Sequence, residues 1–258
     1  MTAAVPVLFE ACVESLAEAM AAVNAGAGRL EVCGAMSEAG ITPSIGLIES
    51  VIERVPVPVF VMARPRGGDF AYGDDEIGVL LRDIAAARSA GAHGIVSGAL
   101  TPAGLVDRDT TRRLVEAASP LDFTFHRAID LTPNLEQALD ALISIGVRRV
   151  LTSGGASTAL VGAGVISRLV RRAGTAATIV GGGNVRSGNV AELLLRTSVT
   201  EVHARPVRSR QMSPTLPPGV KFGALLPASQ RDELDAAEVR AIVEAIATCR
   251  RLGSPSSS

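Results

Sequence analysis

The sequence predicts a single α/β domain with the closed (β/α)8 architecture of a TIM barrel. Short aliphatic segments alternate with amphipathic segments along the 258 residues, which is typical of parallel strands joined by right-handed helical crossovers. A unit of helix end, glycine and apolar strand recurs at residues 25–32, 90–96 and 145–151, and we expect each glycine to end its helix with positive φ. This internal repetition favours a barrel over a doubly wound open sheet.

Eight apolar segments are candidates for the barrel strands. They are rich in Val, Ile and Leu without strict alternation, as expected of a parallel sheet that is covered by helices. Their predicted ranges are 7–12, 29–33, 58–64, 94–97, 122–126, 149–152, 178–180 and 201–204.

Local signals predict where several of the intervening helices begin. Thr42 is a candidate N-cap, with Pro43 at the first helical position. Asp74 precedes Glu76 and an apolar run, which indicates a second helix start. Ser187 opens a short helix before the eighth strand.

The chain after the eighth strand follows a different pattern. Residues 207–232 contain four prolines and fit neither helical nor strand periodicity, so we expect an irregular segment near the barrel mouth. It is either a lid or oligomer contact, or a mobile segment. Residues 234–252 predict a final helix, and we expect 253–258 to be a disordered tail.

Composition excludes several classes of protein. The net charge of −1 and the lack of a basic tail argue against nucleic-acid partners, and no apolar run is long enough to span a membrane. The first residues lack a secretory signal and three cysteines form no disulfide framework, so we expect a reducing, cytoplasmic location. Lys221 is the sole lysine and lies outside the predicted strands, which excludes a Schiff-base aldolase. The three histidines include no His-x-His pair, as the histidine-rich zinc and nickel hydrolases of this fold would require.

The carboxyl ends of the strands carry the candidate catalytic groups. Alternate residues of a strand share a side, so Glu10 lies with Cys12 and Glu31 lies with Cys33 on two neighbouring strands. The fifth strand ends at His126, and the eighth supplies His203 beside Glu201. We consider Glu10, Glu31, His126 and His203 candidate acids and bases. Each cysteine alone is equally explained as a small buried apolar residue.

Arginines and glycine-rich turns predict anion binding at the same face. Arg64 and Arg66 follow the third strand, where they either bind substrate or pair with Glu10 or Glu31 in a structural ion network. Two turns follow the sixth and seventh strands, and their backbone N–H groups are suited to hold an anion, although such turns are also simple tight corners. The candidate residues in these turns are Thr152, Ser153, Gly154, Gly181, Gly182, Gly183 and Asn184.

The chain resembles the CutC copper homeostasis family from about residue 9 to residue 206. The resemblance rests on Glu-Ala-Cys at 10–12, Arg-Leu-Glu-Val-Cys at 29–33, Gly-Ile-Thr-Pro-Ser at 40–44 and Arg-Pro-Arg-Gly-Gly-Asp-Phe at 64–70. It continues with Phe-Thr-Phe-His-Arg-Ala at 123–128, Val-Leu-Thr-Ser-Gly at 150–154 and Glu-Val-His at 201–203. The resemblance implies a TIM barrel, with Cys12 and Cys33 as ligands of Cu(I).

Three functional hypotheses follow. The first is a cytosolic copper homeostasis protein that binds Cu(I), a soft ion that prefers sulfur. The second is an enzyme acting on a small phosphorylated or carboxylated metabolite, which would explain the Arg and Glu residues and the glycine-rich turns. The third places Glu10, Glu31, His126, Glu201 and His203 around Mn²⁺ or Mg²⁺. We also expect the protein to form a homo-oligomer.

Overall fold

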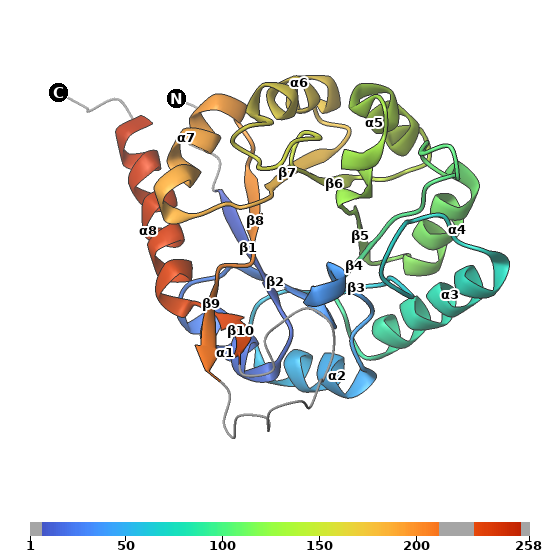
Figure 1. The fold of residues 1–258 in the computed structure, drawn as a ribbon, viewed down its shortest axis with the longest axis horizontal. Coiled ribbons are helices and arrows are strands. Elements are labelled where there is room, and N and C mark those ends of the chain that lie inside the picture. The colour runs from blue at the N-terminus through green and yellow to red at the C-terminus, as the bar shows by residue number, and fades with distance from the viewer. Residues whose placement is uncertain (1–6, 212–229, 254–258) are drawn as a thin grey trace, which may run out of the picture.

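The protein is a closed eight-stranded parallel barrel, as the sequence predicts (Figure 1). The structure, a computed structural model, describes residues 7–211 and 230–253. The strands follow one another in chain order around the barrel, and β1 pairs with both β2 and β8. Their bounds are β1 Leu8–Val13, β2 Arg29–Val32, β3 Val59–Met62, β4 Gly94–Ser97, β5 Asp122–Phe125, β6 Arg149–Thr152, β7 Thr178–Gly182 and β8 Glu201–Ala204.

Helices surround the barrel, and the final helix α8 lies beside α7 (Figure 1). Their bounds are α1 Leu16–Asn24, α2 Ile45–Arg54, α3 Asp74–Ser89, α4 Arg108–Ala118, α5 Leu135–Ser144, α6 Ala163–Ala173, α7 Ser187–Thr197 and α8 Ala236–Gly253. Two short 3-10 turns lie in βα loops, η1 at Met36–Glu38 and η2 at Arg127–Leu131. No helix of the described part of the chain is both long and apolar enough to cross a membrane.

The predicted strands are confirmed, with boundaries that differ by one or two residues at several ends. The expected role of the repeated glycines is also confirmed. Gly26, Gly91 and Gly146 have φ of +102°, +92° and +92°, and each follows a helix and precedes a strand. A side chain at this conformation would be strained, so glycine sets the sharp return from helix to strand.

One of the predicted helix starts is wrong by two residues. Ser44, rather than Thr42, is the N-cap of α2, because its hydroxyl accepts the N–H of Leu47. The Thr42 hydroxyl instead accepts the N–H of Arg64 at 3.0 Å, which ties this loop to the end of β3. Asp74 is the first residue of α3 and Ser187 is the first residue of α7, so these two predicted helix starts are confirmed.

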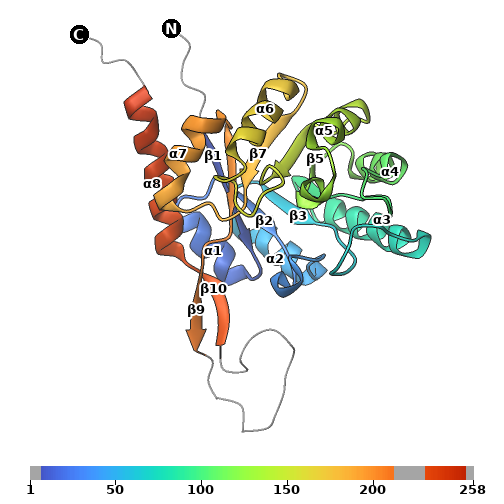
Figure 2. The ribbon, with the colours of Figure 1, turned by 45° about the horizontal axis from the view of Figure 1, so that its top comes forward.

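The prediction of irregular structure over 207–232 is wrong at both ends of that segment. Strands β9 Val207–Gln211 and β10 Gln230–Leu234 form an antiparallel ribbon that projects from the barrel (Figure 2). Its cross-strand pairs are polar, including Arg208 with Glu233, except for Val207 with Leu234 at the base of the ribbon. No apolar periodicity therefore marks these strands in the sequence. Residues 212–229 and 254–258 lie outside the described residues.

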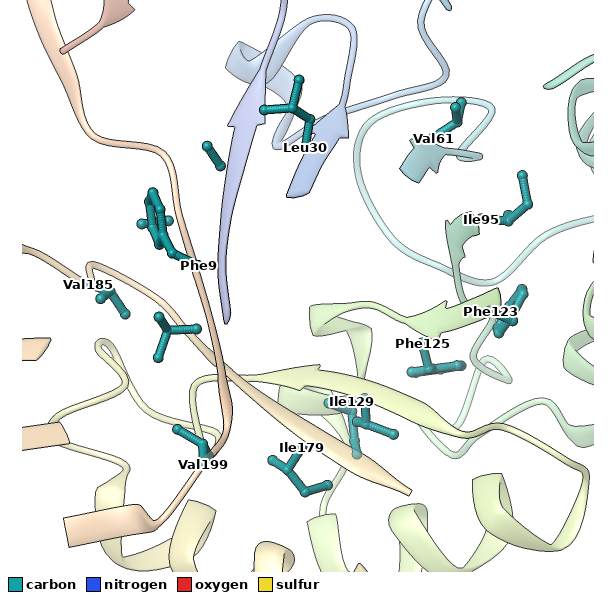
Figure 3. Close-up of a cluster of buried hydrophobic side chains, with 14 of the residues drawn as sticks. Phe9, Leu30, Val61, Ile95, Phe123, Phe125, Ile129, Ile179, Val185 and Val199 are labelled. Carbon is teal, nitrogen blue, oxygen red and sulfur yellow. The ribbon is translucent and has the colours of Figure 1, made fainter. Parts of the chain in front are cut away.

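The main hydrophobic core lies between the outer face of the barrel and the helices. Figure 3 shows part of this layer, in which Leu30, Val61 and Ile95 come from the successive strands β2, β3 and β4. The interior of the barrel is different. There Arg29 and Arg149 lie over the ring of Phe60, with 4.8 Å and 5.0 Å from each guanidinium carbon to the ring centroid. This layer of Arg29, Arg149 and Phe60 lies inside the barrel, beneath the strand ends that face the mouth.

Candidate functional site

Three sulfur atoms meet at the mouth, above β1 and β2. The thiol of Cys12 lies 3.5 Å from the Sγ atom of Cys33 and 3.6 Å from the Sδ atom of Met36. Both cysteines are only 1% exposed. The period of two along neighbouring strands predicts that these cysteines lie side by side, and the structure brings them into contact. We call Cys12, Cys33 and Met36 the sulfur cluster.

The loop that carries Met36 is held in an unusual conformation. Ala35 and Ala39 flank the η1 turn with φ of 43° and 62°, in the left-handed region that costs a non-glycine residue about 1–2 kcal/mol. The carboxylate of Glu14 accepts the N–H of Met36 at 2.6 Å. Gly40 has φ of +88°, and a Cβ atom there would lie 3.4 Å from the Met36 Sδ atom. The backbone is therefore strained where it presents the thioether, a feature common at functional sites.

The surroundings of the two thiols favour their protonated form. The hydrogen bond to Cys33 lowers the pKa of Cys12, but burial and the nearby Glu31 carboxylate raise it further, so the net shift is upward. The hydrogen bond from Cys12 and burial raise the pKa of Cys33 well above its ordinary value. A metal ion at this site would therefore displace protons from the sulfurs.

Glu10 belongs to an ion network inside the barrel. It accepts hydrogen bonds from Arg29 Nε at 2.5 Å and Arg149 at 3.4 Å, and its other oxygen lies 2.8 Å from His203 Nδ1. Glu201 also pairs with both arginines. Although burial favours the neutral acid, Arg149, His203 and Arg29 hold the pKa of Glu10 far below its ordinary value. Glu10 is a fixed anion in this network, whose cations are Arg29 and Arg149 rather than Arg64 or Arg66.

His203 connects this network to the mouth. Its Nδ1 atom lies 3.3 Å from Glu31, and both residues line the mouth cavity. Burial lowers the pKa of His203, but Glu31 and Glu10 raise it by more, so the net direction is upward. Burial is the main cause that raises the pKa of Glu31. Glu31 and His203, two of the four candidate acids and bases, are thus in contact at the cavity.

The residues proposed for a hard divalent ion are only partly together. Potential ligand atoms of Glu10, Glu31 and His203 lie within 4.8 Å of one another. His126 and Glu201 are not part of this group. The carboxylate oxygens of Glu10 are already hydrogen-bonded to two guanidinium groups and an imidazole. Positive charge so close to the group disfavours Mn²⁺ or Mg²⁺.

A cavity of about 450 Å³ opens at the mouth next to the sulfur cluster. His126 lines it and is 4% exposed. Its Nδ1 atom accepts the N–H of Ala128, while Nε2 has no hydrogen-bond partner among the described residues. Burial, assisted by the positive charge of Arg64, lowers the pKa of His126 to about 3. The ring is neutral at physiological pH and offers a proton at Nε2.

The two candidate substrate-binding arginines have different positions. Arg64 is buried in the cavity wall, where its guanidinium donates to the carbonyl oxygens of Glu38 and Gly68 at 2.6 Å and 2.7 Å. Arg66 is outside the cavity and pairs with Glu76 at 2.5 Å.

The glycine-rich turn after β6 already holds a carboxylate. Asp130, from η2, accepts the backbone N–H of Ser153 at 3.0 Å and of Gly155 at 3.0 Å. It also accepts the hydroxyl of Thr152, while the N–H of Gly154 is bonded to the Thr152 hydroxyl at 2.8 Å. These donors have internal partners in place of an external anion.

The turn after β7 is more open to a ligand. Gly181 and Gly182 belong to β7 and pair with β8. Gly183 and Asn184 line the cavity with φ of +118° and +53°. The two predicted anion-binding turns therefore differ, because one is closed by Asp130 and the other faces the cavity.

Several residues of the site were missed in the sequence. Met36 and Asp130 lie in βα loops, where no periodicity predicts side-chain direction. Arg29 carried a usable signal, since it shares its side of β2 with Glu31. Arg149 begins β6 and reaches Glu10 across the barrel, which requires the closed geometry.

The sequence profile of the CutC family matches residues 7–207. The chain belongs to the CutC family. It is 43% identical to the human copper homeostasis protein cutC homolog over 207 residues, covering 80% of this chain and 76% of that protein. A CutC family protein of Caulobacter vibrioides is 40% identical over 241 residues, covering 92% of this chain and 96% of that protein, so this match extends past residue 207.

Solved structures agree with this family membership. The structure of CutC from Streptococcus agalactiae superposes with a TM-score of 0.73 at 30% identity, covering 76% of this chain and 97% of that chain. Phosphoribosylanthranilate isomerase from Thermotoga maritima superposes with a TM-score of 0.57 at 12% identity, covering 94% of this chain and 99% of that chain. At that identity the second likeness concerns the barrel fold alone.

Proposed function

We propose that this CutC family chain acts in cytoplasmic copper homeostasis and binds one Cu(I) ion at the barrel mouth, through Cys12, Cys33 and Met36. The observation that carries the proposal is the sulfur cluster itself. The Sγ atom of Cys12 lies 3.5 Å from the Cys33 thiol and 3.6 Å from the Met36 thioether. Such soft ligands favour Cu(I) over hard cations. The human relative is a copper homeostasis protein cutC homolog, which supports the link to copper homeostasis.

The surroundings of the cluster also fit a buried Cu(I) ion. Phe60, Met62 and Val96 pack against the cysteines, so one side of the cluster is buried in apolar side chains. Burial keeps solvent from the sulfurs, which are otherwise open to oxidation. Two deprotonated thiols and one Cu(I) ion carry a net charge of −1, and His203 and Arg205 line the same cavity as compensating groups.

Zn²⁺ is the chief competitor for this site. Ligand atoms of Cys12, Cys33 and Glu31 lie within 4.8 Å of one another, which would suit a zinc ion with mixed sulfur and oxygen ligands. Cu(I) and Zn²⁺ would use Met36 and Glu31 differently. Cu(I) takes the thioether and leaves the carboxylate, whereas Zn²⁺ takes the carboxylate.

An enzyme of acid–base chemistry is the second candidate function, and one observation favours it. The Oε1 atom of Glu31 is buried, lines the cavity and has no partner within the described chain. Glu31 and His203 would be the proton-exchanging pair, since Glu10 is held by two arginines and His126 is neutral. Turnover of a small anionic metabolite that is lost in Glu31→Gln would support this candidate.

X-ray absorption spectroscopy at the copper edge tests the proposed function. Reduced protein is loaded with one equivalent of Cu(I) under anaerobic conditions. We expect a first coordination shell made only of sulfur, with one sulfur lost in Met36→Leu. A shell that contains oxygen or nitrogen ligands from the protein would contradict the sulfur site. Loading with Zn²⁺ in parallel shows which ion the cluster prefers.

A further inference from the structure

The wall of the mouth cavity contains a buried positive charge without a counter-ion. Arg64 is 3% exposed and forms no ion pair with any carboxylate in the described part of the chain. Carbonyl oxygens of Glu38, Gly40 and Gly68 accept from its terminal nitrogens, while its Nε atom has no partner among the described residues. A buried cation is costly unless negative charge compensates it.

His126 stands beside this cation and offers a second free donor. The ring of Phe70 contacts both side chains, because its centroid lies 4.6 Å from the Arg64 guanidinium carbon and 4.8 Å from the centroid of the imidazole ring. Because Nδ1 of His126 accepts a backbone N–H, the neutral ring carries its proton on Nε2. Both free donors, Arg64 Nε and His126 Nε2, belong to residues that line the same cavity. We call Arg64, Phe70 and His126 the cationic wall.

The remaining charges around the cavity leave an excess of positive groups. Four arginines line it, against the acids Glu31 and Asp130. Asp130 is bound to the β6 turn and to Arg127 at 2.8 Å, and Arg205 pairs with Glu14. Arg186, like Arg64, has no carboxylate partner in the described residues; its guanidinium donates to the carbonyl oxygen of Val185. The cavity is thus prepared for negative charge that the chain does not supply.

We propose that the cationic wall binds a small organic anion, whose carboxylate or phosphoryl oxygens accept hydrogen bonds from Arg64 Nε and His126 Nε2. A volume of about 450 Å³ suits a small metabolite. Gly183 and Asn184 line the cavity too, and their left-handed backbone brings the β7 turn close to a ligand. This site is separate in its ligands from the sulfur cluster, and it does not depend on copper.

The test uses copper-free, reduced full-length protein. Thermal unfolding is followed with orthophosphate, with malate and with glycerol as a neutral probe. At about a hundred times its dissociation constant, a bound anion raises the Tm by about 5 °C or more, and glycerol at equal concentration does not. The anion that raises the Tm more at equal concentration shows whether the wall prefers a phosphoryl group or a carboxylate. No anion-specific shift with either probe would overturn the proposal.

Variants assign the binding to these residues. Arg64→Met is expected to weaken the anion at least tenfold, and Arg66→Met, two residues along and outside the cavity, leaves it unchanged. Arg64 also donates to the loop carbonyls of Glu38 and Gly40, so its replacement can disturb that loop. His126→Leu is therefore the second variant, and we expect it to bind the anion at least fivefold more weakly while its fold stays intact. Equal affinity in both cavity variants and in Arg66→Met would overturn the assignment.

Cu(I) affinity separates this inference from the proposed function. His126→Leu is expected to keep the Cu(I) affinity of the parent protein while it loses the anion. The Cys12→Ser, Cys33→Ser double variant is expected to lose Cu(I) and keep the anion. If the anion fails to bind in a protein that holds Cu(I), the inference about the wall is wrong and the copper site stands.

Discussion

The backbone N–H of Ser153 donates to both carboxylate oxygens of Asp130, with distances of 3.1 Å from the nitrogen to Oδ1 and 3.0 Å to Oδ2. This carboxylate fills the turn after β6 with a negative charge that belongs to the chain. The same carboxylate accepts from Arg127, which lies three residues earlier in η2. A turn that would otherwise attract an anion is therefore a structural link between η2 and β6.

Removing this carboxylate should both destabilise the protein and open an anion site. Asp130→Ala leaves several N–H and hydroxyl groups unpaired, and we expect a loss of about 2–4 kcal/mol in the free energy of unfolding. Sulfate should stabilise the variant more than the parent, because it can accept from the same donors. Urea titrations with and without sulfate measure both effects. Asp140→Ala, at an exposed pair with Arg172, is the control; an equal response to sulfate there would contradict the prediction.

The low pKa of His126, about 3 in the folded protein, predicts that this residue contributes to the loss of folding stability in acid. The ordinary pKa of histidine is near 6.5, so below that pH the unfolded chain binds a proton that the folded chain refuses. Stability therefore falls as the pH drops from 6.5 toward 3, by about 2–3 kcal/mol between pH 6.5 and 4.5 from this residue alone. In His126→Gln this part of the pH-dependent loss of stability should be absent. Parallel slopes of stability against pH in parent and variant would show that His126 titrates normally.

The ion network of Glu10 predicts a structural role. Glu10→Gln leaves Arg29 and Arg149 with less compensating charge in a buried place, and we expect a loss of about 3–5 kcal/mol in stability. Glu136→Gln, at an exposed pair with Arg168, should cost less than about 1 kcal/mol. Urea unfolding measures both. Cu(I) affinity in folded Glu10→Gln should stay within about threefold, and a larger loss would place Glu10 in the metal site.

Met36 is predicted to strengthen Cu(I) binding as a third ligand. Met36→Leu keeps the apolar volume and removes the thioether, so we expect an affinity loss of about tenfold or more. Met20→Leu, at a partly exposed position on α1, is the matched control and should change nothing. Competition with a Cu(I) chelator measures each affinity. Equal affinities in the two variants would leave the two cysteines as the sole protein ligands.

The sequence predicts the barrel and part of its site because strands have a period of two. That period places Glu10 with Cys12 and Glu31 with Cys33, and closure of the barrel brings His203 on β8 next to β1. Loops have no such period, so neither the position of Met36 nor the contact of Asp130 with the β6 turn could be predicted. The polar β9–β10 ribbon escaped prediction for a related reason, since neither face of β9 is buried against the core.

The central claim is that Cys12 and Cys33 hold Cu(I), and competition with a chromogenic Cu(I) chelator under reducing, anaerobic conditions tests it most directly. The parent protein should bind one Cu(I) per chain, and the Cys12→Ser, Cys33→Ser double variant should bind more than about a hundredfold more weakly. Cys249→Ser, which alters the half-buried cysteine of α8, should bind as tightly as the parent. Unchanged Cu(I) affinity in the folded double variant would contradict the account.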